Sequence, residues 1–365
     1  MYENSDSFRQ FANIERYGVN PSLAITPGSQ TRILFNYEYF NDGRVVDRGV
    51  PSFHGRPSTP DRSTFFGNPK ESYADAGVHI GSVTFDHQAG RWNIRNLTTI
   101  ANYDKFYQNV LPGAVNADRT LVALTGYNNA TQRTNAFNQT DIGTIFRTGA
   151  IRHTIVIGSE IGRQSTNNFR NTGYFNDSTT SILAPYRSPT VFTPVTFRQS
   201  ASDADNHTVA TVGAGYMQDQ IELHRRVQVV AGLRYDSFNL DYFNNRNGQK
   251  LERRDNLLSP RLGLVLRPAE TISVYSSYSV SYLPSAGDQF SSLDATTQTL
   301  RPEKFNNYEA GVKWDVRRYL SLSTAVYRLD RDNTRSRDLN DPTRIVQTGS
   351  QRTNGYEMWK SDGTS

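Results

Sequence analysis

The sequence predicts an all-β fold, an antiparallel transmembrane β-barrel, from two observations. The first is a period of two in hydrophobicity that recurs along the 365-residue chain. In residues 305–316 one side of the segment carries Tyr308, Ala310, Val312, Trp314 and Val316, and the other carries Asn307, Glu309, Gly311, Lys313 and Asp315. Successive side chains of a strand point to opposite faces, so this segment is a strand with one apolar face and one charged face.

The second observation is the spacing of such segments. Strands are predicted near residues 15–26, 30–42, 78–88, 91–106, 135–147, 151–163, 207–219, 225–238, 258–267, 271–283, 305–316 and 319–329, with partial strands at both chain ends. Short connections such as TPGS (26–29) and RPAET (267–271) alternate with long ones at about 43–77, 107–134, 164–206, 239–257, 284–304 and 330–351. All short turns therefore lie at one end of the sheet and all long loops at the other, as in outer-membrane barrels.

Composition supports strands over helices. Tyr (20) and Phe (19) are abundant, Met (3) is scarce, and no apolar run reaches the roughly 18 residues of a transmembrane helix. The absence of Cys excludes disulfides, thiolate metal sites and Cys nucleophiles. Basic residues give a net charge of +5 but form no block or nucleic-acid motif, so nucleic acid is not an expected partner.

A soluble β-propeller or sandwich is the alternative fold, because alternation also describes a strand between core and solvent. Propellers repeat at a fixed period of about 40 to 50 residues, whereas the spacing here is irregular. Polar loops of about thirty residues are also uncommon in compact soluble domains. These features favour the barrel.

No enzymatic site is predicted. The six His residues form no HExxH or close metal-ligand pattern, and the glycine-containing motifs GSEIG (158–162) and GAG (213–215) match neither a nucleophile elbow nor a dinucleotide loop.

Charged strand residues are expected to form an ion-pair network in a polar lumen: Arg234, Asp236, Arg261, Arg267, Glu309, Lys313 and Asp315.

Two predicted long loops combine arginine with aromatic residues. RQSTNNFRNTGYFNDS supplies the candidate ligand residues Arg163, Phe169, Arg170, Tyr174 and Phe175. RLDRDNTRSRDLNDPTR supplies Arg331, Arg335 and Arg337, together with Arg328 and Arg344. Guanidinium groups bind planar anions through paired hydrogen bonds and stack on rings, so these loops suit a bulky, aromatic, anionic ligand; the alternative is an ordinary solvated loop.

Several segments resemble the barrel of TonB-dependent siderophore receptors. They are GYMQDQIELHRRVQVVAGLRYDSF (215–238), SPRLGLVLRPAETISVYSSYSVSYLPS (259–285) and LRPEKFNNYEAGVKWDV (300–316). VDRGVPSFHGRP (46–57) and RSTFFGNPKESY (62–73) are similar to the catecholate-type branch. The resemblance implies a Gram-negative outer-membrane barrel of 22 strands with an N-terminal plug, embedded in outer-membrane lipid. It implies uptake of a ferric siderophore with energy from TonB, and no cofactor, because the siderophore carries the iron.

The chain departs from this family pattern at both ends. MYENSDSFRQF already resembles an early barrel strand, so no counterpart of the plug, the TonB box or a signal peptide is recognised, and the pattern is lost after Met358. We therefore expect a partial barrel domain over residues 1–358 with about fourteen strands, a non-family tail over 359–365, and a chain that is an internal fragment of a receptor. A receptor for a hydroxamate siderophore or another nutrient, and a passive porin-like channel, remain alternative functions.

Overall fold

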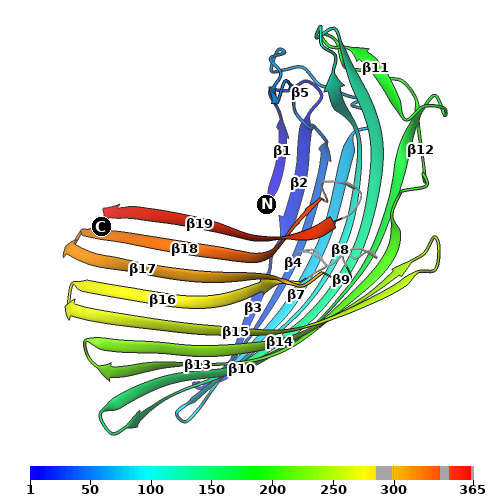
Figure 1. The fold of residues 1–365 in the computed structure, drawn as a ribbon. Helices are drawn as coiled ribbons and strands as arrows, with labels where there is room; N and C mark the ends of the chain where they lie inside the picture. The colour runs from blue at the N-terminus through cyan, green and yellow to red at the C-terminus, as the bar shows by residue number, and fades with distance from the viewer. Residues whose placement is uncertain (285–297, 299, 338–344, 363–365) are drawn as a thin grey trace.

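The computed structural model describes residues 1–284, 298, 300–337 and 345–362. Almost all of the regular structure is β-strand (Figure 1). None of the helical turns in this part of the chain has the length and apolar character needed to cross a membrane.

The strands follow one another along the chain as follows: β1 (Tyr2–Asp6), β2 (Asn13–Val19), β3 (Ser22–Gly28), β4 (Thr31–Val45), β5 (Ser52–Phe53), β6 (Arg56–Pro57), β7 (Tyr73–Ala89), β8 (Trp92–Val115), β9 (Leu121–Thr148), β10 (Ile151–Phe175), β11 (Ser181–Pro185), β12 (Val195–Arg198), β13 (Asp205–His224), β14 (Val227–Asn244), β15 (Lys250–Ala269), β16 (Ile272–Leu283), β17 (Glu303–Arg317), β18 (Leu320–Arg337) and β19 (Ile345–Asp362).

Seventeen of these strands form one sheet, and β5 and β6 form a separate hairpin. Neighbours along the chain pair antiparallel, from β1 through β2, β4, β7, β8, β9, β10 and β13 to β19. The sheet curves strongly, and the short turns lie along its lower and left-hand rim in Figure 1. Within the described residues β1 and β19 are each paired on one side only, so the sheet is open.

The strand predicted at residues 15–26 is two strands. β2 and β3 both pair with β4, and Asn20 and Pro21 separate them. Pro21 has no N–H and cannot donate to the ladder, although its carbonyl still accepts a hydrogen bond from the Tyr37 N–H at 3.1 Å. The ladder is therefore interrupted by one proline and then resumes in the same register.

Several segments predicted as long loops are strands. β8 and β9 continue through most of residues 107–134, and β10 runs to Phe175, through the stretch expected to be a ligand loop. Above a membrane the outward face of a barrel contacts water or loops instead of lipid, so it needs no apolar stripe. The period-two signal therefore disappears from the sequence while the backbone ladder continues.

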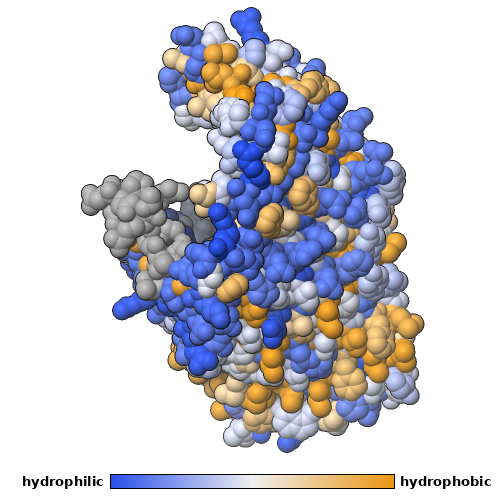
Figure 2. Space-filling view, turned by 90° about the vertical axis from the view of Figure 1, so that its right-hand side faces the viewer, coloured by the Kyte–Doolittle hydropathy of each residue, from blue (hydrophilic) through white to orange (hydrophobic). Residues whose placement is uncertain are grey.

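The register separates an outward face from a lumenal face. Leu264, Ser276, Ala310 and Val326 form one row across β15 to β18 on the outward face. Exposed large hydrophobic residues gather on this face and include Leu262, Leu264, Leu266, Tyr308, Trp314 and Val326. Figure 2 shows many hydrophobic residues in the lower part of the surface, below a more hydrophilic zone, and a second, smaller group at the top. This is the distribution expected where the lower part of the wall faces lipid.

Tyrosine rings on the lumenal face lie over glycines of the neighbouring strand. Tyr275 is paired with Gly311, and a Cβ atom at Gly311 would lie 2.6 Å from Cε1 of the Tyr275 ring. Tyr327 covers Gly355 in the same way. An aromatic ring that covers a strand glycine replaces the missing side-chain packing of that glycine and fixes the register.

The C-terminal strand runs beyond the expected domain boundary. β19 continues past Met358 to Asp362 and pairs with the start of β18, with Ser361 opposite Ser321. The boundary placed after Met358 therefore falls inside a strand.

Candidate functional site

Two of the charged strand residues expected to form ion pairs in the lumen, Arg234 and Asp236, are paired on the lumenal face. Arg234 lies between Glu160 and Asp236, with Nη2 at 3.0 Å from Glu160 Oε2 and 2.7 Å from Asp236 Oδ1. These three side chains help to line a lumenal cavity of about 430 Å³ that also contains Phe137 and Phe238. The cavity combines apolar walls with one cation shared between two carboxylates.

Towards the long-loop end of β8, β9 and β10, the lumenal face carries a group that we call the tyrosine–arginine wall: Arg48, Tyr107, Tyr127 and Arg170. The Tyr107 and Tyr127 rings stack with centroids 5.5 Å apart. The Arg170 guanidinium carbon lies 3.9 Å from the Tyr127 centroid, and Arg48 Nη1 donates to the Tyr107 hydroxyl at 3.4 Å. Two flat rings are thus flanked by two cations, which suits an aromatic anion.

Asp203 fixes the position of Arg170. Its Oδ1 lies 3.3 Å from Arg170 Nε, and its carboxylate is buried. Burial opposes ionisation, but hydrogen bonds from Ser200 and Thr172 and the charge of Arg170 outweigh it, so the pKa of Asp203 is lowered. Asp203 is therefore an anion at neutral pH and holds the guanidinium in place over the Tyr127 ring.

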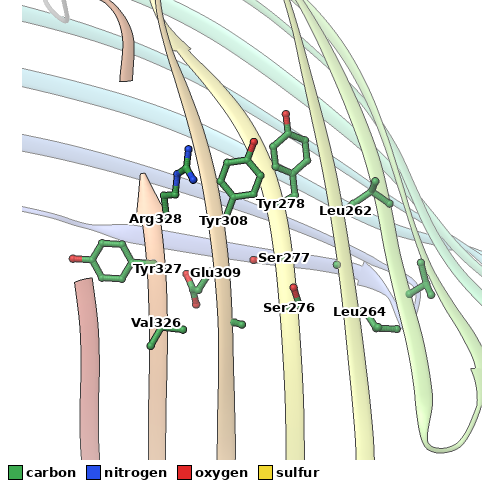
Figure 3. Close-up of a pocket in the computed structure, with 13 residues that line it drawn as sticks. Leu262, Leu264, Ser276, Ser277, Tyr278, Tyr308, Glu309, Val326, Tyr327 and Arg328 are labelled. Carbon is green, nitrogen blue, oxygen red and sulfur yellow. The ribbon is translucent and has the colours of Figure 1, made fainter. Parts of the chain in front are cut away.

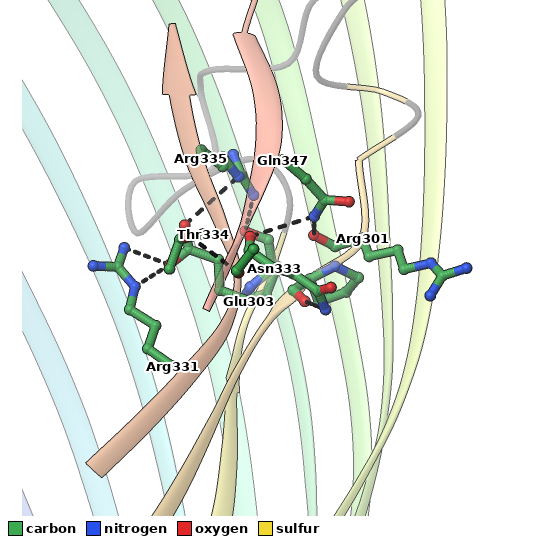
Figure 4. A network of polar contacts seen from close by, with 10 residues as sticks. Arg301, Glu303, Arg331, Asn333, Thr334, Arg335 and Gln347 are labelled. Atoms are coloured by element: carbon green, nitrogen blue, oxygen red, sulfur yellow. Dashed lines mark hydrogen bonds and ion pairs between the residues drawn. The ribbon is translucent and has the colours of Figure 1, made fainter. Parts of the chain in front are cut away.

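A second lumenal group, the Glu303 cluster, comprises Glu303, Arg331 and Arg335 (Figure 4). Glu303 is only 3% exposed and accepts two hydrogen bonds from Arg331, at 2.9 Å from Nε and 2.5 Å from Nη2. Arg335 Nε lies 3.8 Å from the other carboxylate oxygen, and Arg335 Nη2 donates to the Pro284 carbonyl at 3.3 Å. Two guanidinium groups share one carboxylate, so the cluster has a net charge of +1.

The candidate residues of the first predicted loop lie on strand β10 and divide between its two faces. Arg170 and Tyr174 lie on the lumenal face, and the Arg198 guanidinium carbon lies 3.9 Å from the Tyr174 ring centroid. Arg163 and Phe169 are exposed on the opposite face. The structure therefore does not bring these residues together, because odd and even positions of a strand point in opposite directions.

Phe175 has a structural role. It is fully buried in an apolar cluster with Phe66, Val110, Leu124 and Tyr186. A side chain in this environment has no surface to offer a ligand. The expectation that Phe175 contacts ligand is wrong because the sequence does not reveal that Phe66 and β11 pack over this part of the sheet.

The second predicted loop is largely strand β18. Arg331 and Arg335 face the lumen, while Arg328 lies on the outward face, where its guanidinium carbon is 5.9 Å from the Tyr308 ring centroid. The backbone of Arg337 pairs with Ile345. Arg344 and the side chain of Arg337 lie outside the part of the chain that the structure describes.

Tyr107, Tyr127 and Arg48 were not among the residues predicted from the sequence. They fall in segments that the sequence predicts as long loops, and only the pairing of β8 with β9 stacks the two rings. A pattern was present: Tyr103, Tyr107 and Tyr127 recur at odd positions, which is the lumenal parity of these two strands.

A curved antiparallel sheet with a lipid-facing outer surface and a polar, arginine-rich lumenal surface defines the class of transmembrane β-barrel proteins. The family described as "TonB dependent receptor-like, beta-barrel" matches residues 16–364. The chain belongs to this family, which confirms the resemblance seen in the sequence.

Individual relatives agree with this assignment. The chain is 24% identical over 383 residues to "Probable TonB-dependent siderophore receptor PiuA" of Acinetobacter baumannii, covering 95% of the chain and 51% of PiuA. It is 25% identical over 417 residues to "Catecholate siderophore receptor Fiu" of Escherichia coli K12, covering 97% and 52%. It is 26% identical over 380 residues to "Metal-pseudopaline receptor CntO" of Pseudomonas aeruginosa PAO1, covering 98% and 50%.

Solved structures show the same fold. The crystal structure of PiuA superposes with a TM-score of 0.87 at 21% identity, over 97% of this chain and 55% of PiuA. The closed form of Fiu superposes with a TM-score of 0.83 at 21% identity, over 100% and 57%. The chain thus spans about half the length of the curated relatives that it matches.

Proposed function

We propose that this chain forms barrel wall of an outer-membrane receptor that takes up a ferric siderophore with energy from TonB, with catecholates as the preferred ligand class. Membership of the TonB-dependent receptor family supports the receptor function. The names of the relatives PiuA and Fiu support a siderophore, and that of Fiu supports a catecholate. The proposal includes no enzymatic activity.

The tyrosine–arginine wall is the observation that supports a catecholate as the ligand. A ferric catecholate complex is bulky, aromatic and anionic. Stacked Tyr107 and Tyr127 offer flat contact area at the lumenal surface. Arg48 offers positive charge beside them, and Arg170 offers a guanidinium group whose charge is balanced by Asp203. The Glu303 cluster adds positive charge to the same face of the sheet.

The proposal also defines partners and location. The siderophore would bring its iron already chelated, so the protein needs to supply no metal ligands and no cofactor. TonB would act through a plug domain of the full-length protein, and outer-membrane lipid would surround the outward face of the barrel in a Gram-negative cell. Export to that membrane requires a signal peptide in the full-length protein.

Binding measurements on the full-length protein test the ligand class. A ferric tris-catecholate should quench intrinsic tryptophan fluorescence at lower concentration than a ferric hydroxamate of similar size. Tyr127→Leu or Arg170→Gln should weaken catecholate binding by about tenfold, since a desolvated cation–π contact contributes about 1 to 2 kcal/mol. Tyr235→Leu, on the outward face, is the matched control and should leave the affinity unchanged. Preference for the hydroxamate, or equal effects of Tyr127→Leu and Tyr235→Leu, would contradict the catecholate assignment.

Two alternative functions make different predictions. A receptor for another metal chelate is favoured by the similarity to CntO, which is named a metal-pseudopaline receptor. A passive porin-like channel would need no energy. Uptake in cells with and without TonB distinguishes the channel from both receptors, because only a receptor loses uptake when TonB is removed.

A further inference from the structure

The outward face of β15 to β18 contains a groove of about 620 Å³ (Figure 3). Its floor is formed by two small residues, Ser276 and Ala310, which are paired across β16 and β17. Leu264 and Val326 are the neighbours of this pair on the flanking strands and form its sides. The groove is therefore a depression in the lipid-facing surface, where two larger side chains would have made the wall flat.

Two tyrosines close the groove at its upper end. The ring centroids of Tyr278 and Tyr308 lie 5.0 Å apart, and the two rings lie side by side in Figure 3. Tyr308 is nine residues from Arg317, where β17 ends. At about 3.4 Å per residue and a tilt of about 40°, it lies about 23 Å above that end, near the upper edge of an apolar band about 25 Å tall. Tyrosines at this height mark the level of the lipid head groups.

Two arginines lie beside and above these rings. Arg328 is in the same row as Tyr308, and Arg352 is opposite Asp330 on β19. Arg328 Nη2 is 2.8 Å and Arg352 Nε is 2.6 Å from the Asp330 carboxylate, and the two arginine side chains are 46% and 56% exposed. One carboxylate balances only one of the two guanidinium groups, so this site has a net charge of +1.

We propose that this groove binds one lipid with a phosphate head group. An acyl chain lies over Ser276 and Ala310, and the phosphate accepts hydrogen bonds from Arg328 and Arg352. Guanidinium groups match the geometry of phosphate oxygens and bind them through paired N–H groups. This lipid site is distinct from the proposed siderophore site, because the two lie on opposite faces of the sheet.

Charge and depth favour a lipid over a second copy of the chain as the occupant. A two-fold contact between copies is self-complementary, so it would bring the same positive sites towards each other at the same height in the membrane. A lipid head group instead supplies the missing negative charge. A groove with a floor of small side chains also leaves room for a flexible acyl chain.

The test uses the full-length protein reconstituted in nanodiscs of phosphatidylcholine with a varied fraction of phosphatidylglycerol, followed by native mass spectrometry of the released protein. The wild type should retain one phosphatidylglycerol in preference to phosphatidylcholine. Arg328→Gln with Arg352→Gln should weaken that retention by at least about tenfold, because hydrogen bonds to charged groups are lost. Arg254→Gln, an exposed arginine of the same face outside the groove, is the control and should retain the lipid.

A second variant tests the acyl-chain half of the site. Ala310→Leu fills the groove floor while leaving both arginines in place, and it should also lose the retained lipid. Heat-modifiable migration on gels verifies that each variant is folded. Retention of lipid by both variants, equal loss in Arg254→Gln, or equal retention of phosphatidylcholine by the wild type would each overturn the proposal.

Discussion

Charging the lipid-facing side of β15 provides the most direct test of the face assignment. Leu264 lies five residues before Ala269, where the strand ends. With about 3.4 Å per residue and a tilt of about 40°, this places Leu264 about 13 Å above the turn, close to the middle of an apolar band about 25 Å tall. An arginine at the midplane costs about 2 to 4 kcal/mol, so Leu264→Arg should shift the folding equilibrium by about two orders of magnitude.

The matched control is the next residue of the same strand. Val265 lies at nearly the same height, one residue closer to the turn, but faces the lumen, where it is opposite Gln228 and Tyr275. Val265→Arg should therefore cost less than about 1 kcal/mol, because water and polar neighbours solvate the guanidinium. Urea titration of the full-length protein in phosphatidylcholine vesicles measures both variants. Equal destabilisation of Leu264→Arg and Val265→Arg would refute the assignment of the two faces.

Three further predictions follow from the lumenal face. Gly311→Ala should destabilise the protein by about 1 to 3 kcal/mol in the same urea titration, because the new methyl group would overlap the neighbouring tyrosine ring. Asp203→Asn should reduce the amount of stability that the protein loses in acid. The lowered pKa of Asp203 in the wild type gives a stabilisation that is present above about pH 4 and is lost as the pH falls below it. Replacing Arg331, Arg335 and Glu303 together by Gln removes one net positive charge without leaving a buried carboxylate unpaired. It should slow association of an anionic ferric complex, measured by stopped flow at low ionic strength.

Each of these predictions has a matched control. Gly213 has no atom within 4 Å of an added Cβ, so Gly213→Ala should change stability by less than about 0.5 kcal/mol, and an equal loss would discount the ring contact. Asp203→Glu keeps the carboxylate, so it should lose stability in acid as the wild type does. If its stability depends on pH as that of Asp203→Asn does, another group is responsible for the titration. Salt at about 1 M should remove the difference in association rate, and a difference that persists would exclude electrostatic steering.

The ligand surface shows why the lumenal site needed the structure. The sequence predicts Arg170 as a ligand residue from its position beside aromatic residues, but its aromatic partner in the structure, Tyr127, is 43 residues away along the chain. Strand pairing between β9 and β10 brings the two side chains together. Long-range pairing of this kind leaves no local trace in composition or spacing.

The sequence by itself determined the all-β class, the lipid and lumenal faces of the lower sheet, and the family. It could do so because lipid on one side and water on the other force a period of two on every spanning strand, as in residues 305–316. Only the tertiary structure decided how far the strands continue above the membrane, where Arg163 and Arg170 separate onto opposite faces and Phe175 becomes buried. In that region both faces of the sheet contact water, loops or other strands. The two faces therefore do not differ in hydrophobicity, and the sequence shows no period of two. Only the pairing of the strands determines to which face each side chain points.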